Sequence, residues 1–432
     1  MRKTKTYLKY FGLTLAIIIV SPVALVGSML IYWDMRPPPD FYADPGLKYV
    51  ETNNWIAVPH GDDINYQHKS NTDMIYYDGY FYLINQESKW HLQDHQGKLV
   101  IRRSTDAKNW EYVHTIQLPN TDVRDPKFAN VSGTLFVYFL PNYFFDPGPN
   151  TTYYCKKPYN SDAWTEPVEM KVNVSYYDEN GDIGGYHKVG GWNFWRPKTN
   201  DNTTWYVMAT GRKNTTTTTE HDYDVSGTMS VLFSSTDGEN WTEVSEVYTR
   251  FGNAEVCLDF LPDGRIISTH RVGSMGIEGY AFGNPHGGTI MATSWDTNYK
   301  NWSFAPDFQT RLDGATLFTL NNSRRVFSAG RNHLGPRSDM GNHLAEKRTA
   351  IYEVKEDRLV HLFDLPSHGD TAYTGVSIVN GSIYICYYTC PVGSVSDYPW
   401  IVGIAFFTKT DIRMSQLNAT RLLEYADSVG GG

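Results

Sequence analysis

A short motif recurs along this chain and restricts the folds that the chain can adopt. It reads Ser-Thr-Asp-Ala-Lys-Asn-Trp at Ser104–Trp110 and Ser-Thr-Asp-Gly-Glu-Asn-Trp at Ser235–Trp241. A longer form occupies Ser294–Trp302, and a shortened form occupies Ser161–Trp164. The aspartate of each copy can cap a turn by accepting hydrogen bonds from backbone N–H groups, and the tryptophan can pack beneath a sheet. We therefore interpret the motif as a structural turn on the outer rim of a repeated unit, without a catalytic role.

The segments between the copies of this motif have the pattern of β-strands. Met74–Leu83 and Thr134–Leu140 are short runs rich in β-branched and aromatic residues, and turn-forming residues flank them. Asn380-Gly381 fits a two-residue hairpin turn. No long helical periodicity follows residue 45. A repeat of about 50 to 80 residues in an all-β chain is typical of propeller blades, and we predict a six-bladed β-propeller, with five blades as the alternative.

The N-terminal residues have the pattern of a membrane anchor. Basic side chains lie within residues 1–9, and residues 10–33 contain no charged side chain. At about 1.5 Å per helical residue, this run is long enough to cross a hydrocarbon core of about 30 Å. The basic flank predicts a cytoplasmic N-terminus and an extracellular or lumenal remainder. The alternative is a cleaved signal peptide, but its apolar region normally spans about 7–15 residues and ends at a small-x-small site, which is not found here.

The expected domain organisation follows from these patterns. Three prolines follow the apolar run, and a proline run forms an extended, stiff spacer. We divide the chain into a cytoplasmic segment 1–9, a transmembrane signal-anchor helix 10–33, a proline-rich spacer 34–46, a propeller 47–425 and a flexible tail 426–432.

A dense set of Asn-x-Ser/Thr sequons supports the placement of the propeller outside the cytoplasm. They lie at Asn130, Asn150, Asn173, Asn202, Asn214, Asn240, Asn301, Asn321, Asn380 and Asn418. Sequons spread along the whole domain fit surface loops of a protein that passes a glycosylation machinery. The alternative is a composition rich in Thr and Asn that carries no glycan.

Composition excludes some classes of partner. The chain has 38 Lys and Arg against 47 Asp and Glu, so it lacks the excess of basic residues that nucleic-acid binding requires, and we expect no such partner. The aromatic content of 15% fits half-buried strands, and some rings could stack on sugar faces. The four cysteines include no Cys-x-x-Cys pair, so we expect no zinc site, and no other metal or cofactor constellation is visible. Their disulfide pairing stays open.

The repeated turn resembles the Asp-box of sialidases, shortened by one residue. Further motifs occur in the order expected of sialidase-like six-bladed propellers, over most of the region after the anchor. They are Val123–Lys127, Trp195–Pro197, Asn253–Glu255, Leu261–Arg265 followed by Arg271, Ala329–Arg331, and Gly369–Gly375 followed by Tyr387 and Tyr388. The resemblance implies a glycoside hydrolase with arginines that bind a substrate carboxylate, a tyrosine nucleophile assisted by a glutamate, and an aspartate acid/base.

By this resemblance, the carboxylate-binding candidates are first Arg271 and Arg331, and next Arg124 and Arg196. A planar guanidinium meets a carboxylate through two parallel hydrogen bonds, which lysine cannot do. Two parts of the family pattern are missing. One is the Arg-Ile-Pro motif, and the other is an arginine after the second strand of the first blade, where the chain reads Leu83–Glu87. These departures count against a full cluster of three carboxylate-binding arginines and against sialic acid as the substrate.

The same resemblance makes Tyr373 the nucleophile candidate, Glu255 its base and Asp73 the acid/base. A neutral tyrosine avoids the repulsion that an anionic nucleophile would meet beside a substrate carboxylate, and sialidases are exceptions to the use of two carboxylates. Asp370, in the same motif as Tyr373, is a further catalytic candidate. Each has a structural alternative: Tyr373 as sheet packing, Glu255 as a solvated side chain and Asp370 as a turn cap.

Two other functions compete with the sialidase-like prediction. The chain also resembles five-bladed arabinanase- and fructofuranosidase-like propellers, in which Asp73, Asp125 and Glu255 would be the catalytic carboxylates, with pKa values pushed apart. Asp125 could otherwise form a local salt bridge with Arg124. A catalytically inactive propeller that binds carbohydrate or protein is the third alternative, because a fold does not determine a function. Our leading prediction is a membrane-anchored, exo-acting hydrolase that removes a terminal, sialic-acid-like sugar from extracellular glycans.

Overall fold

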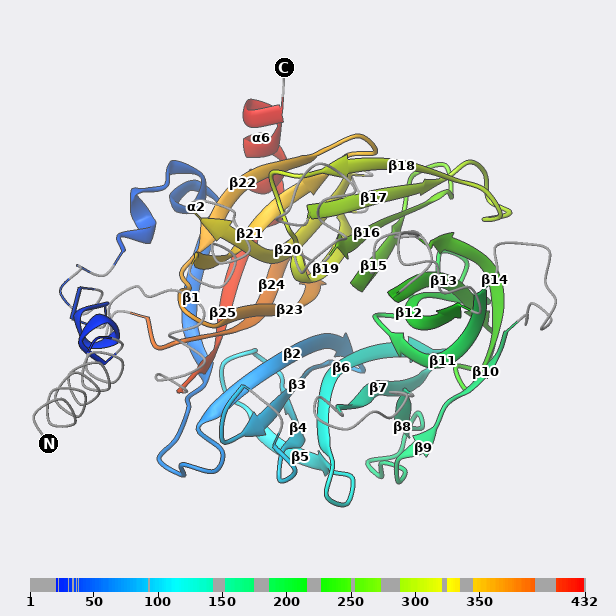
Figure 1. Cartoon of the computed structure of the whole chain (residues 1–432), viewed down its shortest axis with the longest axis horizontal. Helices are drawn as coiled ribbons and strands as arrows, with labels where there is room; N and C mark the ends of the chain where they lie inside the picture. The colour runs from blue at the N-terminus through cyan, green and yellow to red at the C-terminus, as the bar shows by residue number, and fades with distance from the viewer. Residues whose placement is uncertain are drawn as a thin grey trace, which may run out of the picture.

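Six mainly antiparallel sheets surround a common axis in the computed structural model, in the arrangement of a six-bladed β-propeller (Figure 1). The structure describes residues 40–91, 94–142, 152–174, 186–215, 227–249, 253–272, 288–320, 325–334, 345–392 and 409–430, with some of residues 21–39. Within this part of the chain, each sheet runs from an innermost strand near the axis to an outermost strand at the rim. The prediction of an all-β, six-bladed propeller is therefore confirmed, and the five-bladed alternative is wrong.

The blades follow one another along the chain. Blade one has β2 (His68–Tyr77), β3 (Tyr80–Ser88), β4 (Lys98–Ser104) and β5 (Glu111–Ile116). Blade two has β6 (Asp122–Val131), β7 (Thr134–Asn142), β8 (Tyr153–Lys157) and β9 (Val168–Glu169). Blade three has β11 (Tyr186–Phe194), β12 (Trp205–Thr215), β13 (Gly227–Ser235) and β14 (Asn240–Tyr248), with β10 (Lys171–Asn173) parallel to β14 at the rim.

The remaining blades have the same order. Blade four has β15 (Asn253–Phe260), β16 (Ile266–Val272), β17 (Gly288–Ser294) and β18 (Trp302–Asp307). Blade five has β19 (Asp313–Leu320), β20 (Arg325–Leu334), β21 (Glu346–Val354) and β22 (Leu359–Leu365). Blade six has β23 (Thr371–Val379), β24 (Ser382–Thr389), β25 (Asp411–Asn418) and, as its outermost strand, β1 (Glu51–Val58).

The two ends of the propeller chain meet in blade six. Strand β1 pairs antiparallel with β25, so a strand from the N-terminal side completes the sheet that the C-terminal strands begin. This pairing closes the ring and covers an edge that would otherwise be exposed. The β1–β25 hydrogen bonds therefore join the two ends of the propeller chain, whereas β23, β24 and β25 pair among themselves.

Helices flank the closure. The 3₁₀ helix η1 (Phe41–Ala43) precedes α2 (Pro45–Val50), and α6 (Ala419–Gly430) follows β25. Helix α2 packs on α6 so closely that a Cβ at Gly46 would overlap the ring of Tyr425. Residues 426–430, expected as part of a flexible tail, instead form the end of α6, and Ala426 is buried against the blade. The amphipathic α6 gains stability from this packing. The packing is a tertiary contact, so the sequence pattern alone did not indicate the helix.

The four copies of the repeated turn lie at equivalent places, each between the third and the fourth strand of its blade. In the second full copy, the Asp237 carboxylate accepts hydrogen bonds from the backbone N–H groups of Glu239 and Asn240, both at 2.8 Å. Partial burial raises the pKa of Asp237, but hydrogen bonds led by those of Asn240 outweigh it and lower the pKa to about 2. Trp241 is buried beneath the sheet. The turn is therefore stabilised locally, as its sequence indicates.

Aromatic side chains fill the contacts between neighbouring blades. Tyr138 of blade two packs against Phe194 and Trp241 of blade three, with ring centres 6.2 and 6.1 Å apart. These rings belong to one buried cluster that joins the two sheets. Pairs of this kind add to the free energy of burial, so much of the aromatic content is used for packing.

The features expected outside the propeller are only partly described. Among the described residues, no helix is both long enough and apolar enough to cross a membrane, and most of the expected anchor 10–33 lies outside them. Of the sequon asparagines, six are exposed and Asn418 is half-buried, whereas Asn150, Asn321 and the side chain of Asn214 lie outside the description. The exposed ones are Asn130, Asn173, Asn202, Asn240, Asn301 and Asn380. The four cysteines are buried free thiols.

Candidate active site

Each of the six innermost strands contains a shift in its pairing with the neighbouring strand. The shifts fall between Ser70 and Asp73, Arg124 and Lys127, Gly190 and Asn193, Ala254 and Val256, Asp313 and Thr316, and Ala372 and Gly375. Several residues at these places have a positive φ, and they include Asp125 (φ 50°), Glu255 (φ 52°) and Tyr373 (φ 48°). Such conformations cost free energy for residues other than glycine, and bulges redirect side chains. Three of the candidate catalytic residues therefore lie on strained positions at the same end of their strands.

Tyr373 and Glu255 form the centre of the site. The Tyr373 hydroxyl donates a hydrogen bond to Glu255 Oε1, and the backbone N–H of Gly314 donates to Glu255 Oε2 at 2.6 Å. Burial raises the pKa of Tyr373 well above its ordinary value, and the charges of Glu255 and Asp125 raise it further. The phenol is therefore neutral at physiological pH, beside a carboxylate that can accept its proton.

A cluster of arginines surrounds one buried carboxylate next to this pair. Asp313 Oδ1 lies 3.2 Å from Arg271 Nε and 3.0 Å from Arg311 Nε, and Asp313 Oδ2 lies 3.3 Å from Arg331 Nη1. Burial raises the pKa of Asp313, but the charges of Arg271 and Arg311 outweigh it and hold the pKa well below its ordinary range. Glu255 also pairs with Arg271, and Asp370 lies 3.7 Å from Arg331, so three guanidinium groups and three carboxylates form one network.

The arginines of this cluster differ in accessibility. The Arg271 side chain is 24% exposed and pairs with Glu255, whereas the Arg331 side chain is 4% exposed. Arg331 Nε donates to the backbone oxygen of Thr371 at 2.7 Å, and its Nη2 donates to the Tyr388 hydroxyl at 3.0 Å. Arg271 is therefore the arginine with the most surface for a ligand. Arg331 is buried behind it and is held by hydrogen bonds to Thr371 and Tyr388.

Sequence reasoning missed Arg311 and Asp313. Arg311 lies outside every motif of the expected pattern, and its only local signal is its position two residues before the start of strand β19. Asp313, the first residue of that strand, faces Arg331 across the β19–β20 pair of blade five, and it meets Arg271 because blade four lies beside blade five.

Asp125 adds an acid to the same region. Its side chain is half-buried, and burial raises the pKa of Asp125, with an opposite contribution from Lys127 and a further increase from Glu255. Lys127 is fully buried, with Nζ 4.2 Å from the centre of the Trp195 ring and 5.9 Å from that of Tyr373. Asp125 is thus protonated to a higher pH than an ordinary aspartate, as a general acid needs to be.

Arg124 does not form the local salt bridge that the sequence allowed. Its Nε lies 2.6 Å from Asp122 Oδ2, whereas Asp125 is turned away by its left-handed backbone. The Arg124 side chain is 15% exposed. It therefore borders the region of Asp125 while its charge is largely neutralised by Asp122.

Asp73 and Arg196 lie apart from the Tyr373–Glu255 pair. The Asp73 side chain is fully buried, its Oδ2 accepts the backbone N–H of Phe128 at 2.7 Å, and its Oδ1 is paired with Arg196. Arg196 also donates to the backbone oxygen of Met74 at 3.0 Å. Both oxygens of Asp73 are occupied and neither faces solvent, so this residue has no surface for the acid/base role expected of it.

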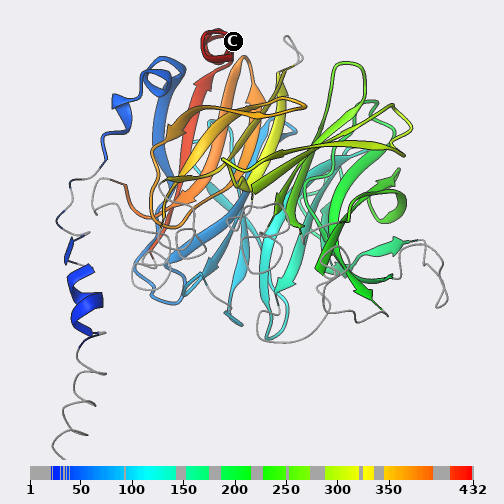
Figure 2. The same ribbon diagram turned by 45° about the horizontal axis from the view of Figure 1, so that its top comes forward.

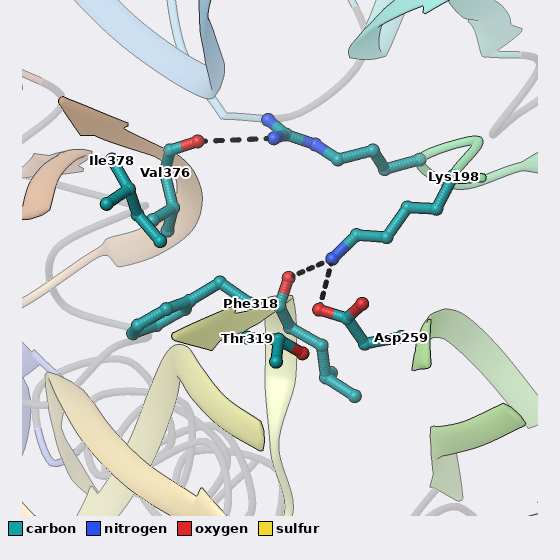
Figure 3. Close-up of a pocket in the computed structure, with 8 residues that line it drawn as sticks. Lys198, Asp259, Phe318, Thr319, Val376 and Ile378 are labelled. Carbon is teal, nitrogen blue, oxygen red and sulfur yellow. Dashed lines mark hydrogen bonds and ion pairs between the residues drawn. The ribbon is translucent and has the colours of Figure 1, made fainter. Parts of the chain in front are cut away.

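Arg196 instead faces a separate pocket of about 250 Å³ (Figure 3). Lys198 lines this pocket and lies 2.6 Å from Asp259 Oδ2, towards the end of β15 opposite to Glu255. Ile378, near the end of β23, lies on its other side. The substrate-binding role expected of Arg196 is therefore not supported, because the Tyr373–Glu255 pair lies at the beginnings of these strands.

Asp370 connects Arg331 to two histidines. Its Oδ1 accepts a hydrogen bond from the Tyr388 hydroxyl at 2.8 Å and lies 3.7 Å from Arg331 Nη2. Its Oδ2 lies 2.6 Å from His91 Nδ1. Burial raises the pKa of Asp370, but the charges of His91, His68 and Arg331 outweigh it and hold the pKa far below its ordinary range. Asp370 is thus an ionised, fully buried carboxylate beside Arg331.

Comparisons with known proteins identify the fold. No family model matches the chain, and no curated protein does. A solved structure of a protein of unknown function from Dyadobacter fermentans is similar with a TM-score of 0.60 and 14% identity, over 86% of this chain and 99% of that chain. Trypanosoma rangeli sialidase is similar with a TM-score of 0.55 and 10% identity, over 83% of this chain and 56% of that chain. The endosialidase of phage phi92 is similar with a TM-score of 0.55 and 11% identity, over 86% of this chain and 69% of that chain.

These similarities place the chain in one structural class. The protein is a six-bladed β-propeller with a sialidase-like fold, seen from two directions in Figures 1 and 2. At 10 to 14% identity, the similarity establishes the fold alone. The chain spans little more than half the length of the trypanosomal sialidase.

Proposed function

We propose that this protein is an exo-acting glycoside hydrolase that removes a terminal, acidic sugar, in the manner of sialidases. The observation that carries the proposal is the hydrogen bond from the Tyr373 hydroxyl to Glu255, beside the partly exposed side chain of Arg271. A neutral phenol paired with a base and flanked by arginine suits an anomeric carbon that bears a carboxylate.

The proposed first step forms a bond between Tyr373 Oη and the anomeric carbon. Glu255 Oε1 takes the phenolic proton, so a neutral enzyme group becomes a nucleophile only as it reacts. Asp125 gives its proton to the glycosidic oxygen as the bond from that oxygen to the anomeric carbon breaks. Water then attacks the same carbon, its proton passes to Asp125, and Glu255 returns a proton to the departing Tyr373 oxygen. This double displacement retains the configuration at the anomeric carbon.

The arginine cluster gives the proposed substrate its acidic character. Arg271 would meet the substrate carboxylate with two parallel hydrogen bonds, and Arg311 and Arg331 would add positive charge from behind. Asp313 holds all three guanidinium groups, so the cluster is ordered before substrate arrives. Such preorganisation reduces the free energy that binding must spend on orientation.

The alternative functions have less support. A furanosidase-like mechanism would need Asp73 as a catalytic carboxylate, and the buried ion pair of Asp73 with Arg196 leaves it no route to substrate. A binding protein without turnover would not need a nucleophile and base held on strained backbone, which is the arrangement at Tyr373 and Glu255.

We also propose that the propeller is anchored in a membrane and faces the extracellular side or an organelle lumen, with its glycans on exposed asparagines. The uncharged run 10–33, its basic flank and the exposed sequon asparagines support this placement. The partner would be a glycan or glycoconjugate on the same side of the membrane.

The decisive experiment measures hydrolysis by the purified full-length chain of fluorogenic glycosides of sialic acid, glucuronic acid, arabinofuranose and fructofuranose. We expect turnover of an acidic glycoside, and a loss of at least about a hundredfold in Tyr373→Phe and Glu255→Gln. Tyr384→Phe, in the adjacent strand and outside the site, is the matched control and keeps wild-type turnover. Turnover of a neutral furanoside that survives Tyr373→Phe would contradict the proposal.

A further inference from the structure

Three side chains from distant parts of the chain bring possible metal-ligand atoms together beside Arg331. His68 begins strand β2, His91 follows β3, and Asp370 precedes β23. His68 Nε2, His91 Nδ1 and one Asp370 oxygen all lie within 4.8 Å of one another. The planes of the two imidazole rings are 82° apart, so their edges converge on the carboxylate from different directions.

One ring nitrogen of His68 lies beside Thr410, and the other faces Asp370. Thr410 Oγ1 gives its only hydrogen to the backbone oxygen of Lys69 at 2.7 Å, so it can only accept from His68 Nδ1, 3.4 Å away. His68 Nδ1 therefore donates to Thr410, and Nε2 is the nitrogen that faces Asp370 Oδ2, at 3.6 Å.

The groups behind the ligand atoms have the arrangement that supports a bound metal. Metal-ligating histidines generally donate their second N–H to a neighbouring oxygen, as His68 does to Thr410, and ligating carboxylates are hydrogen-bonded in turn. Asp370 Oδ1 accepts from the Tyr388 hydroxyl and faces Arg331, so Oδ2 is the oxygen left towards the histidines. The positive charge of Arg331 thus lies on the far side of the carboxylate from the proposed ion.

The distances suit a small transition-metal ion. Atoms bound at about 2.0–2.2 Å to a tetrahedral ion lie about 3.3–3.6 Å apart, and the separation of His68 Nε2 from Asp370 Oδ2 is 3.6 Å. His91 Nδ1 lies 2.6 Å from Asp370 Oδ2 and has to withdraw by under about 1 Å to admit the ion. Its side chain is 16% exposed, so it is the member of the trio with room to move.

We propose that His68, His91 and Asp370 form a binding site for a divalent transition-metal ion such as Zn²⁺. Two imidazole nitrogens with one carboxylate oxygen favour Zn²⁺ and related ions over Ca²⁺ and Mg²⁺, which prefer oxygen ligands. Three protein ligands leave a coordination position for water or a substrate group. This proposal does not depend on the hydrolase activity, because metal binding can be measured without turnover.

The test is isothermal titration of Zn²⁺ into the untagged full-length chain after removal of metal with a chelator. We expect one ion per chain, with affinity reduced at least tenfold in His91→Ala and in His91→Gln. His60→Ala is the matched control, because His60 Nδ1 pairs with a single carboxylate, Asp411 Oδ1 at 2.8 Å, and it should bind as the wild type does. Ca²⁺ should not compete.

A second readout covers the case in which a histidine variant binds weakly because it is misfolded. Zn²⁺ should raise the melting temperature of the wild-type chain and of His60→Ala, and should leave that of His91→Gln unchanged. The proposal is overturned if the wild type takes up no Zn²⁺, or if both His91 variants bind it with unaltered affinity. In either case, His91 and Asp370 form only an ion pair.

Discussion

Gly314 lies against the ring of Tyr373 with no space for a side chain. A Cβ on Gly314 would be 2.8 Å from Tyr373 Cδ2 and 2.9 Å from the Tyr373 backbone nitrogen. Its φ of 58° is also a conformation that residues with a side chain rarely adopt. Because the Gly314 N–H binds Glu255, this glycine holds both members of the central pair in place.

Gly314→Ala should therefore impair catalysis beyond its effect on folding. We expect kcat/KM to fall about 10- to 100-fold, because a small displacement of a reacting group can cost about a hundredfold in rate. Gly381→Ala is the matched control: Gly381 also has a positive φ, of 75°, but nothing lies within 4 Å of its Cβ position. Both variants should lose about 1 kcal/mol of unfolding free energy from backbone strain. Equal activity of the two variants would contradict the close contact.

Arg271→Lys should weaken binding of the acidic substrate. A lysine keeps the charge but loses the two parallel hydrogen bonds, so we expect KM to rise about tenfold or more. The control is Arg265→Lys, because Arg265 lies on a hairpin and pairs with Glu356 away from the site. Kinetics on an acidic and a neutral glycoside would separate the effects, and an unchanged KM for the acidic one would remove Arg271 from the carboxylate site.

Asp73→Asn should affect stability more than chemistry. The change leaves the Arg196 guanidinium buried without its counter-charge, which costs about 3 kcal/mol or more in comparable pairs. Urea unfolding measures this loss, and Asp263→Asn in the exposed pair with Arg265 should lose less than about 1 kcal/mol. A variant that keeps wild-type stability and loses all turnover would restore Asp73 as the acid/base.

The raised pKa of Asp125 predicts the shape of the pH profile. A general acid acts in its protonated form, so activity should fall as pH rises through the pKa of Asp125, which lies above the usual 3.8. Asp125→Asn should abolish this alkaline limb. The variant should retain more activity on aryl glycosides, whose leaving groups need little protonation, than on alkyl-linked glycans. An equal loss on both substrates would argue against the acid role.

Asp237→Ala should destabilise the repeated turn of blade three by about 1 kcal/mol, since the backbone N–H groups of Glu239 and Asn240 lose their acceptor. The pKa of Asp237 is lowered to about 2 in the folded state, so its contribution is present above the unfolded pKa near 4 and is lost as pH falls towards 2. The difference in unfolding free energy between the two proteins should therefore shrink from pH 5 to pH 2. A constant difference would show that the carboxylate charge is not involved.

The sequence predicted the pair Tyr373 and Glu255, but it did not predict the residues that surround this pair. Glu255, Tyr373, Arg271 and Arg331 each belong to a motif, and the structure places all four in one group of contacts. Asp73 also lies in a motif, but only the packing of β2 against blade two buries it beneath the backbone of Phe128. Nothing local in the chain distinguishes an aspartate that faces a pocket from one that faces an arginine in the interior.

The sequence by itself determined the class of fold. The repeated turn is stabilised by hydrogen bonds between residues two or three positions apart, and the strand pattern is equally local, so both can be read from short segments. The tertiary structure alone decided which side chains share a site. Asp313 with Arg271, and Asp370 with His68 and His91, come from different blades. Contacts of that kind depend on how the blades pack and how β1 closes the ring, and neither leaves a mark in any short stretch of sequence.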